Sequence, residues 1–191
     1  MLQLRTERLH LRELQEGDWE LFLRLSSDPS VRIWQSFLPG SSEPECRQWV
    51  RDMMFHNCQR PRFGYNFAML VQLSGEEIGW IGFGHASDKQ VGDREFGFAV
   101  LPNYWSRGYT TEALREVLSL AFSQRDANTI YGECNSLNVA SARVMQKCGM
   151  KLVRRWTERS ENQPDQENER YLIERSEWKV NNRPALGWDG E

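Results

Sequence analysis

The sequence predicts an α+β fold built on a mixed central sheet. Apolar periodicity and turn residues divide the chain into a strand, two helices, three strands, a helix, a strand, a helix and two strands, an order typical of α+β domains. The chain has 191 residues, of which 39% are hydrophobic and 12% aromatic, enough for one hydrophobic core and too few for two. We therefore expect one domain over residues 1–180 and a C-terminal tail over residues 181–191.

A strand and two helices are predicted in the first third of the chain. Residues 9–12 alternate between apolar and polar side chains, as in a half-buried strand. Asp18 then stands at the N-cap position of a helix whose apolar residues recur at helical spacing. Ser42 and Glu45 have the spacing of a capping box, so we expect a second helix from there to about Cys58.

The middle of the chain predicts three antiparallel strands in a meander. Residues 67–73 are apolar and β-prone, a Ser-Gly turn follows, and residues 78–84 return. A third run ends at Leu101. The second run contains three glycines, which we expect to allow close strand packing rather than to bind a dinucleotide: Gly79, Gly82 and Gly84.

Helices and strands alternate in the second half. We expect helices over residues 111–123 and 138–148, and strands over residues 129–134, 152–156 and 171–178. Residues 157–169, between the last two strands, include five acidic side chains and one arginine. Such a polar run predicts a mobile surface loop. The alternative is that its charges attract cationic amines.

Composition excludes several classes of partner. Lys and Arg number 24, Asp and Glu number 27, and the formal net charge is −3. This balance leaves no broad cationic surface for a nucleic acid. The chain also has no signal-like leader and no run of about 18 apolar residues, so we expect a cytoplasmic protein without a membrane partner.

The cysteines and histidines predict neither a metal site nor a disulfide framework. The four cysteines show no CxxC pairing, and the three histidines lie far from one another in the sequence. Cys134 and Cys148 stand among apolar neighbours, where a free thiol usually behaves as a small buried hydrophobe. A reduced cytosolic protein without a bound metal fits this pattern.

A glycine turn between the third strand of the meander and the next helix is the main candidate for a binding site. It reads Tyr104-Trp105-Ser106-Arg107-Gly108-Tyr109-Thr110-Thr111-Glu112-Ala113. Gly108 tolerates φ > 0, which allows successive backbone N–H groups to converge. The helix start adds open N–H groups and a positive dipole end, a combination that favours a pyrophosphate. An ordinary tight turn is the alternative.

This turn and a second motif resemble a known family. Residues 105–113, read together with Asn138-Val139-Ala140-Ser141-Ala142-Arg143-Val144-Met145-Gln146-Lys147-Cys148-Gly149-Met150, are similar to the acetyl-CoA-binding core of GNAT N-acetyltransferases, RimJ/RimL-like branch. Residues 4–12 resemble the opening strand of that branch. The resemblance implies the GNAT fold, with a mostly antiparallel sheet and helices on both faces, and acetyl-CoA as cosubstrate.

The resemblance also implies which residues bind the pyrophosphate of acetyl-CoA. They would do so through backbone N–H groups: Ser106, Arg107, Gly108, Tyr109 and Thr110. Thr110 departs from the Gly or Ala that the family has there. Its side chain narrows the approach of a phosphate oxygen, although its hydroxyl could donate a hydrogen bond instead.

Further residues are implied along the pantetheine arm. Backbone groups of Ala99, Val100 and Leu101 would pair with pantetheine where the strands at residues 94–101 and 129–135 splay apart. Asn138 would bond to the same arm, although a helix N-cap is the simpler explanation for this residue. The hydroxyl of Ser141 would lie near the sulfur and protonate the departing thiolate.

Glu95 is the candidate general base. Strand alternation places it on the same face as Gly97 and Ala99, two small residues that leave space for an amine beside it. An attacking ammonium must first lose a proton, and a carboxylate within direct or one-water reach can accept it. The alternative is a solvated strand glutamate paired with Arg94 or Arg125.

The acceptor is a primary amine whose class the sequence leaves open. Five aromatic residues could line its pocket or simply pack in the core: Trp34, Phe37, Phe63, Tyr65 and Phe67. We rank a peptide or peptide-like amine first, and a small-molecule amine or polyamine as the alternative. A regulatory acetyl-CoA-binding module without turnover is the alternative of another class. We expect a monomer or homodimer.

Overall fold

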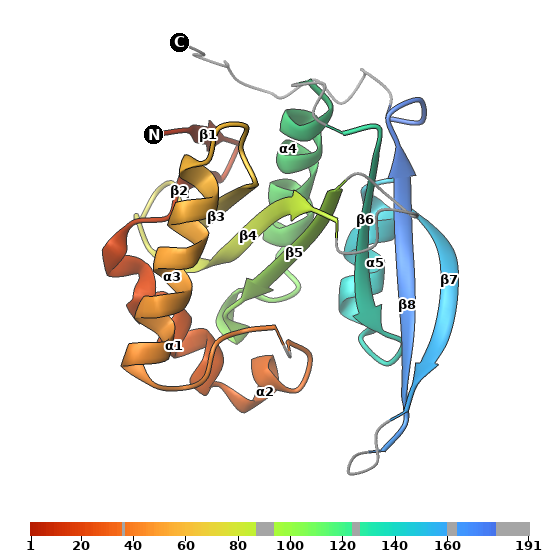
Figure 1. The fold of residues 1–191 in the computed structure, drawn as a ribbon, viewed down its shortest axis with the longest axis horizontal. Coiled ribbons are helices and arrows are strands. Elements are labelled where there is room, and N and C mark those ends of the chain that lie inside the picture. The colour runs from red at the N-terminus through yellow and green to blue at the C-terminus, as the bar shows by residue number, and fades with distance from the viewer. Residues whose placement is uncertain (36, 87–93, 124–126, 160–163, 179–191) are drawn as a thin grey trace.

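The central sheet is mixed and mostly antiparallel. The computed structural model describes residues 1–35, 37–86, 94–123, 127–159 and 164–178, and the expected tail over residues 181–191 lies outside these ranges. Within them, eight strands form one sheet in the order β1-β2-β3-β4-β5-β6-β8-β7 (Figure 1). Neighbouring strands are antiparallel except β5 and β6, which are parallel. The predicted α+β class is confirmed.

The strands follow the apolar runs of the sequence. Their bounds are β1 (Gln3–Arg5), β2 (Leu9–Glu13), β3 (Gly64–Val71), β4 (Glu77–His85), β5 (Arg94–Val100), β6 (Thr129–Asn135), β7 (Lys151–Glu158) and β8 (Gln166–Glu174). The opening strand that the resemblance implies over residues 4–12 is two strands, β1 and β2, which pair antiparallel. The apolar periodicity predicted only the second of them, because a run as short as β1 shows no periodicity.

Helices cover both faces of the sheet. They are α1 (Trp19–Ser27), α2 (Pro29–Arg32), α3 (Glu43–Cys58), α4 (Tyr109–Ser123) and α5 (Val139–Lys147). The helices α1 and α3 lie on one face, and α4 and α5 lie on the other (Figure 1), which confirms the layered arrangement. Of the helices in the described ranges, none has the length and apolar character needed to cross a bilayer.

Two hydrophobic clusters join these layers. On one face, Phe22 of α1 and Val50 of α3 pack with Trp80 of β4. On the other face, Leu114 of α4 packs in a cluster with Phe67 of β3. The central strands contribute to both clusters because successive side chains of a strand point to opposite faces.

Two helix starts lie where the sequence places them, but their side-chain bonds differ from those expected. Asp18 is the N-cap residue of α1, yet its carboxylate makes no cap bond. It accepts instead from the Arg12 guanidinium at 2.7 and 2.8 Å and from the Gln15 N–H at 2.8 Å. Ser42 donates to Glu45 rather than capping the α3 backbone. Local side-chain partners therefore compete with the backbone for the same oxygens.

The predicted loop over residues 157–169 is wrong at both ends. Thr157 and Glu158 continue β7, and residues 166–169 already belong to β8, which ends at Glu174 rather than near Trp178. This polar hairpin forms because cross-strand pairs stabilise it, among them the Arg155–Glu169 ion pair at 2.9 Å. Residues 160–163, at its tip, lie outside the described ranges.

The junction of β5 and β6 creates the opening in which the site lies. Their parallel pairing consists of Arg94 opposite Ile130 and Glu95 opposite Tyr131. β5 stays paired with β4 as far as Val100, while β6 diverges from it (Figure 1). The predicted splay of these two strands is confirmed. Beyond Glu95, one edge of β5 therefore faces an opening in the sheet.

Candidate active site

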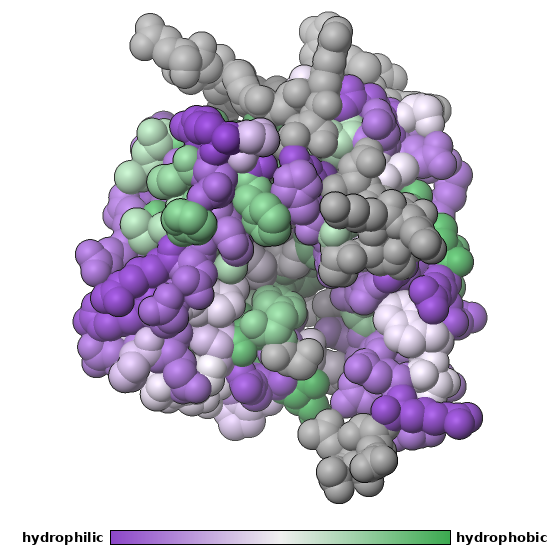
Figure 2. Space-filling model, viewed as in Figure 1, coloured by the Kyte–Doolittle hydropathy of each residue, from purple (hydrophilic) through white to green (hydrophobic). Residues whose placement is uncertain are grey.

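Two adjoining cavities occupy this opening. The larger, of about 530 Å³, extends past Glu95, and the smaller, of about 410 Å³, reaches the turn at Gly108. We call them the Glu95 cavity and the Gly108 cavity. Figure 2 shows the molecule hollowed in the middle of this face, with hydrophobic residues around the hollow. Five residues line both cavities and mark where they meet: Trp34, Gln35, Phe98, Asn138 and Ser141.

The turn at Gly108 has the backbone geometry expected of an anion site. Gly108 has φ +80° and Ser106 has φ +59°, both in the left-handed region. Holding a serine there costs about 1 kcal/mol or more, and such strain gathers at functional sites. The first α4 bond runs from the Glu112 N–H to the Gly108 carbonyl at 3.1 Å. The backbone N–H groups that come before Glu112 therefore have no partner within the helix, and they lie at the end of the Gly108 cavity.

Of the five residues predicted to bind pyrophosphate, three line the Gly108 cavity: Ser106, Gly108 and Thr110. Arg107 and Tyr109 are not among the lining residues and face Arg8. The Arg107 carbonyl accepts from the Arg8 guanidinium at 2.9 Å, and that guanidinium lies 4.7 Å from the Tyr109 ring centroid. Arg107 and Tyr109 therefore connect the turn to Arg8, which lies between β1 and β2.

Glu112 completes this attachment from within α4. Arg8 donates to its carboxylate from the backbone N–H at 2.8 Å and from the side chain at 2.7 Å, and Thr6 donates to it at 2.5 Å. Burial alone would raise the pKa of Glu112, but the hydrogen bonds from Thr6 and Arg8 outweigh it and hold this pKa below its ordinary value. Glu112 is therefore an anion that anchors the turn.

The backbone groups of Leu101 and Ala99 point away from the opening. The Leu101 N–H donates to the Ile78 carbonyl of β4, and the Leu101 carbonyl accepts from the Tyr104 N–H, both at 2.9 Å. The Ala99 carbonyl also faces β4, since a Cβ added to Gly79 would lie 2.4 Å from its oxygen. The expected pairing of Ala99 and Leu101 with pantetheine is therefore corrected.

The carbonyls of Phe98 and Val100 point away from β4, toward the opening. These carbonyls accept hydrogen bonds from the side of the opening: Phe98 from the Gln35 amide at 3.0 Å, and Val100 from the Trp105 indole N–H at 2.6 Å. Val100 is among the residues predicted to pair with pantetheine, and Phe98 is not. Alternation showed that every second residue faces the same edge, but it could not show which edge remains unpaired.

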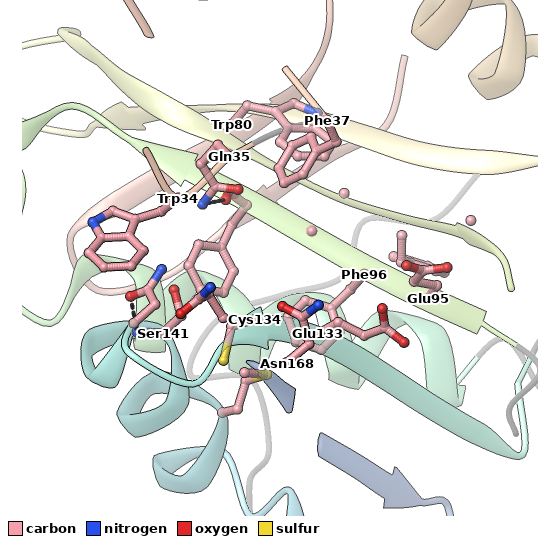
Figure 3. A pocket seen from close by; sticks show the side chains of 18 of the residues that line it. Trp34, Gln35, Phe37, Trp80, Glu95, Phe96, Glu133, Cys134, Ser141 and Asn168 are labelled. Atoms are coloured by element: carbon pink, nitrogen blue, oxygen red, sulfur yellow. Dashed lines mark hydrogen bonds between the residues drawn. The ribbon is translucent and has the colours of Figure 1, made fainter. Parts of the chain in front are cut away.

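Helix α5 contributes Asn138 and Ser141 at the meeting point of the cavities. Both are buried, and the Asn138 side chain caps the helix by accepting from the Ser141 N–H at 3.1 Å (Figure 3). The N-cap role and the position beside the opening therefore hold together. Arg143 and Lys147 also line the Gly108 cavity. These two cations were not predicted as site residues, although their i, i+4 spacing on the helix was the available signal.

Glu95 lies in the larger cavity, as predicted. Its carboxylate accepts from the Tyr131 hydroxyl at 3.0 Å, across the last paired position of β5 and β6. Arg94, one of the partners considered for it, donates to the Phe63 carbonyl at 3.3 Å. Tyr131 is fully buried and therefore holds the Glu95 carboxylate at the base of the splay.

Glu133 is a second carboxylate of the Glu95 cavity (Figure 3). It lies on β6, two residues after Tyr131, and accepts from Arg170 at 2.6 and 2.5 Å. The Arg170 guanidinium in turn lies 4.6 Å from the Tyr131 ring centroid. Glu133 was not predicted, because its place in the same cavity as Glu95 depends on the parallel pairing of two strands that are distant in sequence.

The five aromatic residues proposed for the acceptor pocket divide between the cavity and the core. Trp34, Phe37 and Phe63 line the Glu95 cavity. Tyr65 and Phe67 lie in the core on the α4 side of the sheet. Alternation along β3 separates Tyr65 and Phe67 from the cavity floor.

The cysteines and metal-ligand residues support no other chemistry here. Cys134 lines the Glu95 cavity, and burial, together with the charge of Glu169, raises the pKa of its thiol to about 12. Burial raises the pKa of the Cys148 thiol to about 12 as well. Both thiols are protonated at neutral pH and are poor nucleophiles. The described residues contain no group of three or more His, Cys, Asp or Glu that could hold a metal ion.

Comparisons with known proteins agree with this geometry. An Aspergillus fumigatus protein, FsC-acetyl coenzyme A-N(2)-transacetylase, is 35% identical over 95 residues, which are 48% of this chain and 40% of that protein; the alignment thus spans less than half of the relative. RimL, a ribosomal L7/L12 alpha-N-protein acetyltransferase solved with coenzyme A, superposes with a TM-score of 0.76 at 14% identity, covering 91% of this chain and 98% of its own.

A second similar structure is spermidine N-acetyltransferase from Vibrio cholerae, solved with CoA and spermine. Its TM-score is 0.73 at 18% identity, with 88% of this chain and 96% of that chain covered. At 14% and 18% identity, the RimL and spermidine N-acetyltransferase structures are evidence for the fold alone. The family model described as the acetyltransferase (GNAT) domain matches residues 8–151, a range that contains both the turn at Gly108 and the start of α5. This chain therefore belongs to the GNAT family of acetyltransferases.

Proposed function

We propose that the protein transfers the acetyl group of acetyl-CoA to a primary amine by direct attack in a ternary complex. The meeting of the two cavities at Phe98 and Ser141 carries this proposal. A thioester held along β5 from the Gly108 cavity would present its carbonyl to an amine in the Glu95 cavity. No covalent enzyme intermediate is needed, and the protonated thiol of Cys134 offers no nucleophile for one.

Acetyl-CoA would be bound mainly by backbone groups. N–H groups from the turn at Ser106 to Thr110 would hold the pyrophosphate. Backbone groups of Phe98 and Val100 would pair with pantetheine, and one N–H at this edge would polarise the thioester carbonyl. Asn138 would bond to the same arm.

Glu95 and Ser141 would move the protons. Glu95 accepts the proton of the incoming ammonium, directly or through one water, so that the neutral amine attacks the carbonyl carbon. The new C–N bond forms and the C–S bond breaks. Ser141 then donates a proton to the departing thiolate. Tyr131 acts on this reaction through Glu95 by holding its carboxylate in place.

The Glu95 cavity favours an acceptor that arrives as a cation. The described residues that line it include Glu95, Glu133 and Glu158 but no lysine or arginine. One similar structure is named as an acetyltransferase of ribosomal protein L7/L12, and another as a spermidine acetyltransferase. A peptide amine and a small-molecule amine are therefore both candidate classes of acceptor. The peptide-like amine ranked first from the sequence, a cytoplasmic location and a monomeric or homodimeric state all remain proposals.

The first experiment measures release of CoA thiol from acetyl-CoA across four groups of amines, with the product mass as confirmation. The groups are peptide α-amines, peptide side-chain amines, aromatic monoamines and polyamines. Turnover above the no-acceptor background, together with the gain of one acetyl group, would support the proposal. Tight acetyl-CoA binding without turnover in any group would favour the regulatory module instead.

Arg143 and Lys147 give a prediction for the cofactor side. The double substitution Arg143→Gln and Lys147→Gln should raise the Kd for acetyl-CoA about tenfold, because two cations leave the Gly108 cavity. Isothermal titration at two salt concentrations measures this effect, and the variant should lose most of the salt dependence of the wild type. An unchanged Kd and salt slope would show that these cations do not touch the phosphates.

Tyr131 gives a prediction for the catalytic side. Tyr131→Phe removes one hydrogen bond to Glu95 and keeps the ring under Arg170, so kcat should fall about two- to tenfold. The KM for acetyl-CoA should not change, because Tyr131 does not line the Gly108 cavity. A shift of the acidic limb of the pH–rate profile would separate this role from a general loss of stability. A variant with wild-type kcat and an unchanged profile would remove Tyr131 from the mechanism.

A further inference from the structure

The floor of the Glu95 cavity is made largely of glycine. Gly64 of β3, Gly82 and Gly84 of β4, and Gly97 of β5 all line it. The strand register places Gly64 opposite Gly84 and Gly82 opposite Gly97, so the four residues share one face of three adjacent strands. The side chains of Trp80 and Asn66 cover Gly82, and the Trp80 ring also covers Gly97, so the backbone of this floor is bare at Gly84.

Packing explains some of these glycines but not all. A Cβ on Gly82 would lie 2.6 Å from the Asn66 Oδ1 and 2.7 Å from the Tyr65 carbonyl oxygen, so Gly82 is required by its neighbours. A Cβ on Gly84 would meet its nearest neighbour at 3.4 Å, an ordinary contact. On Gly97 it would meet the edge of the Trp80 ring at 3.3 Å.

The contact at Gly97 is closer than an ordinary one, so the buried Trp80 ring explains this glycine, and Gly84 is left. Backbone conformation does not explain Gly84 either, because it is not among the glycines with positive φ, which are Gly75, Gly108 and Gly149. A glycine inside a strand lowers stability by about 0.5–1 kcal/mol relative to alanine. An occupant that lies directly on the backbone is a physical reason for keeping such a residue in a cavity.

Aromatic rings stand at two sides of this floor. Phe37 lies 5.7 Å from Trp80 between ring centroids. Phe63 lies between His56 at 4.7 Å and His85 at 5.0 Å. Phe37 and Phe63 are 46% and 45% exposed, and both line the cavity. Such rings suit the faces and edges of another planar ring.

The polar groups of the cavity are unevenly distributed. Glu95 and Glu133 lie together on β5 and β6, at one side of the glycine floor (Figure 3). Two side-chain amides that could bind a peptide backbone are already engaged: Asn66 bonds to Asn57 at 3.2 Å, and Gln35 donates to the Phe98 carbonyl at 3.0 Å. The third carboxylate of the cavity, Glu158, accepts from the Asn168 amide at 3.2 Å. The cavity thus offers the carboxylates of Glu95 and Glu133 beside aromatic rings, which suits a monoamine that carries a ring.

We infer that the acceptor is an arylalkylamine, a single primary amine joined by a short aliphatic linker to a planar aromatic ring. The ring lies on Gly84 between the two aromatic groups, and the ammonium points to Glu95. This inference rests on the acetyl transfer proposed above, because it names the acceptor of that same reaction.

The test compares wild type and Gly84→Ala with four acceptors: tryptamine, butylamine, spermidine and an Ala-Ala-Ala peptide. Tryptamine should have the highest kcat/KM in the wild type. In Gly84→Ala its KM should rise about tenfold, because the added methyl group occupies the plane of the ring. Butylamine should change less than about twofold, since a thin chain can pass the methyl group. The Kd for acetyl-CoA should stay the same in both proteins.

Gly17→Ala is the matched control, because a Cβ there meets nothing within 4 Å and the residue lies outside both cavities. Tryptamine binding to the CoA-bound protein is titrated in parallel. Turnover highest with spermidine or the peptide would overturn the arylalkylamine inference and leave acetyl transfer intact. Tryptamine binding that Gly84→Ala weakens, without any turnover, would keep the ligand class and overturn the proposed reaction. Failure of both binding and turnover would overturn both.

Discussion

Glu95→Gln should lower kcat by about 10²- to 10⁴-fold, because the amide keeps the size of the side chain but cannot accept the proton of the ammonium. The Kd for acetyl-CoA should be nearly unchanged, since Glu95 lines only the larger of the two cavities. Steady-state kinetics with the best acceptor and a separate titration of acetyl-CoA measure the two effects. The loss should shrink as pH rises toward the pKa of the amine, because more of the acceptor is then neutral without help.

Glu20→Gln is the control for this substitution, because Glu20 is exposed on α1 and lies outside both cavities. It should keep wild-type kinetics. A Glu95→Gln protein that retains its rate would exclude Glu95 as the base. Glu133, the neighbouring carboxylate of the same cavity, would then be the next residue to substitute.

Gly108→Ala should weaken acetyl-CoA binding at least about tenfold. The φ of +80° is unfavourable for a residue with a Cβ by about 1–2 kcal/mol, and relaxing it would turn the N–H groups of the turn away from the pyrophosphate. A Cβ there would also meet the Arg8 guanidinium at 3.3 Å, so the attachment of the turn would shift as well. Calorimetric titration gives the Kd, and thermal unfolding gives the accompanying loss of stability.

Gly75→Ala separates these two effects. Gly75 has φ +70° and open space around its Cβ position, and it lies in the β3–β4 turn, outside both cavities. Both variants should lose stability, but Gly75→Ala should bind acetyl-CoA as the wild type does. If Gly108→Ala also binds like the wild type, the turn at Gly108 is not a phosphate site.

The parts of the site that were predictable from the sequence are those built by short segments. The strand, turn and helix around Gly108 are contiguous, and their signals are a glycine, a helix start and an apolar period. Glu95 was found because alternation relates it to the next residues of its own strand. The same local signals located α3, α4 and α5 closely.

The parts that were missed depend on pairing between distant segments. The Phe98 carbonyl faces the opening, and the backbone groups of Ala99 and Leu101 do not, because β4 occupies one edge of β5. That is a fact of sheet order that one strand cannot reveal. Glu133 becomes a cavity residue only through the junction with β5. The last hairpin looked like a loop because its strands carry charges on both faces, and only cross-strand pairs such as Arg155 with Glu169 show why it is ordered.

The short junction between β5 and β6 also has a thermodynamic consequence. Two residue pairs join these strands directly, so the sheet is least continuous where the cosubstrate would lie. A molecule that hydrogen-bonds to the free edge of β5 and also contacts α5 would act as a missing strand between the two halves. Saturation at about 100 times its Kd adds about 2.7 kcal/mol to the free energy of unfolding. The folded lifetime of this protein would then depend on the cellular supply of acetyl-CoA.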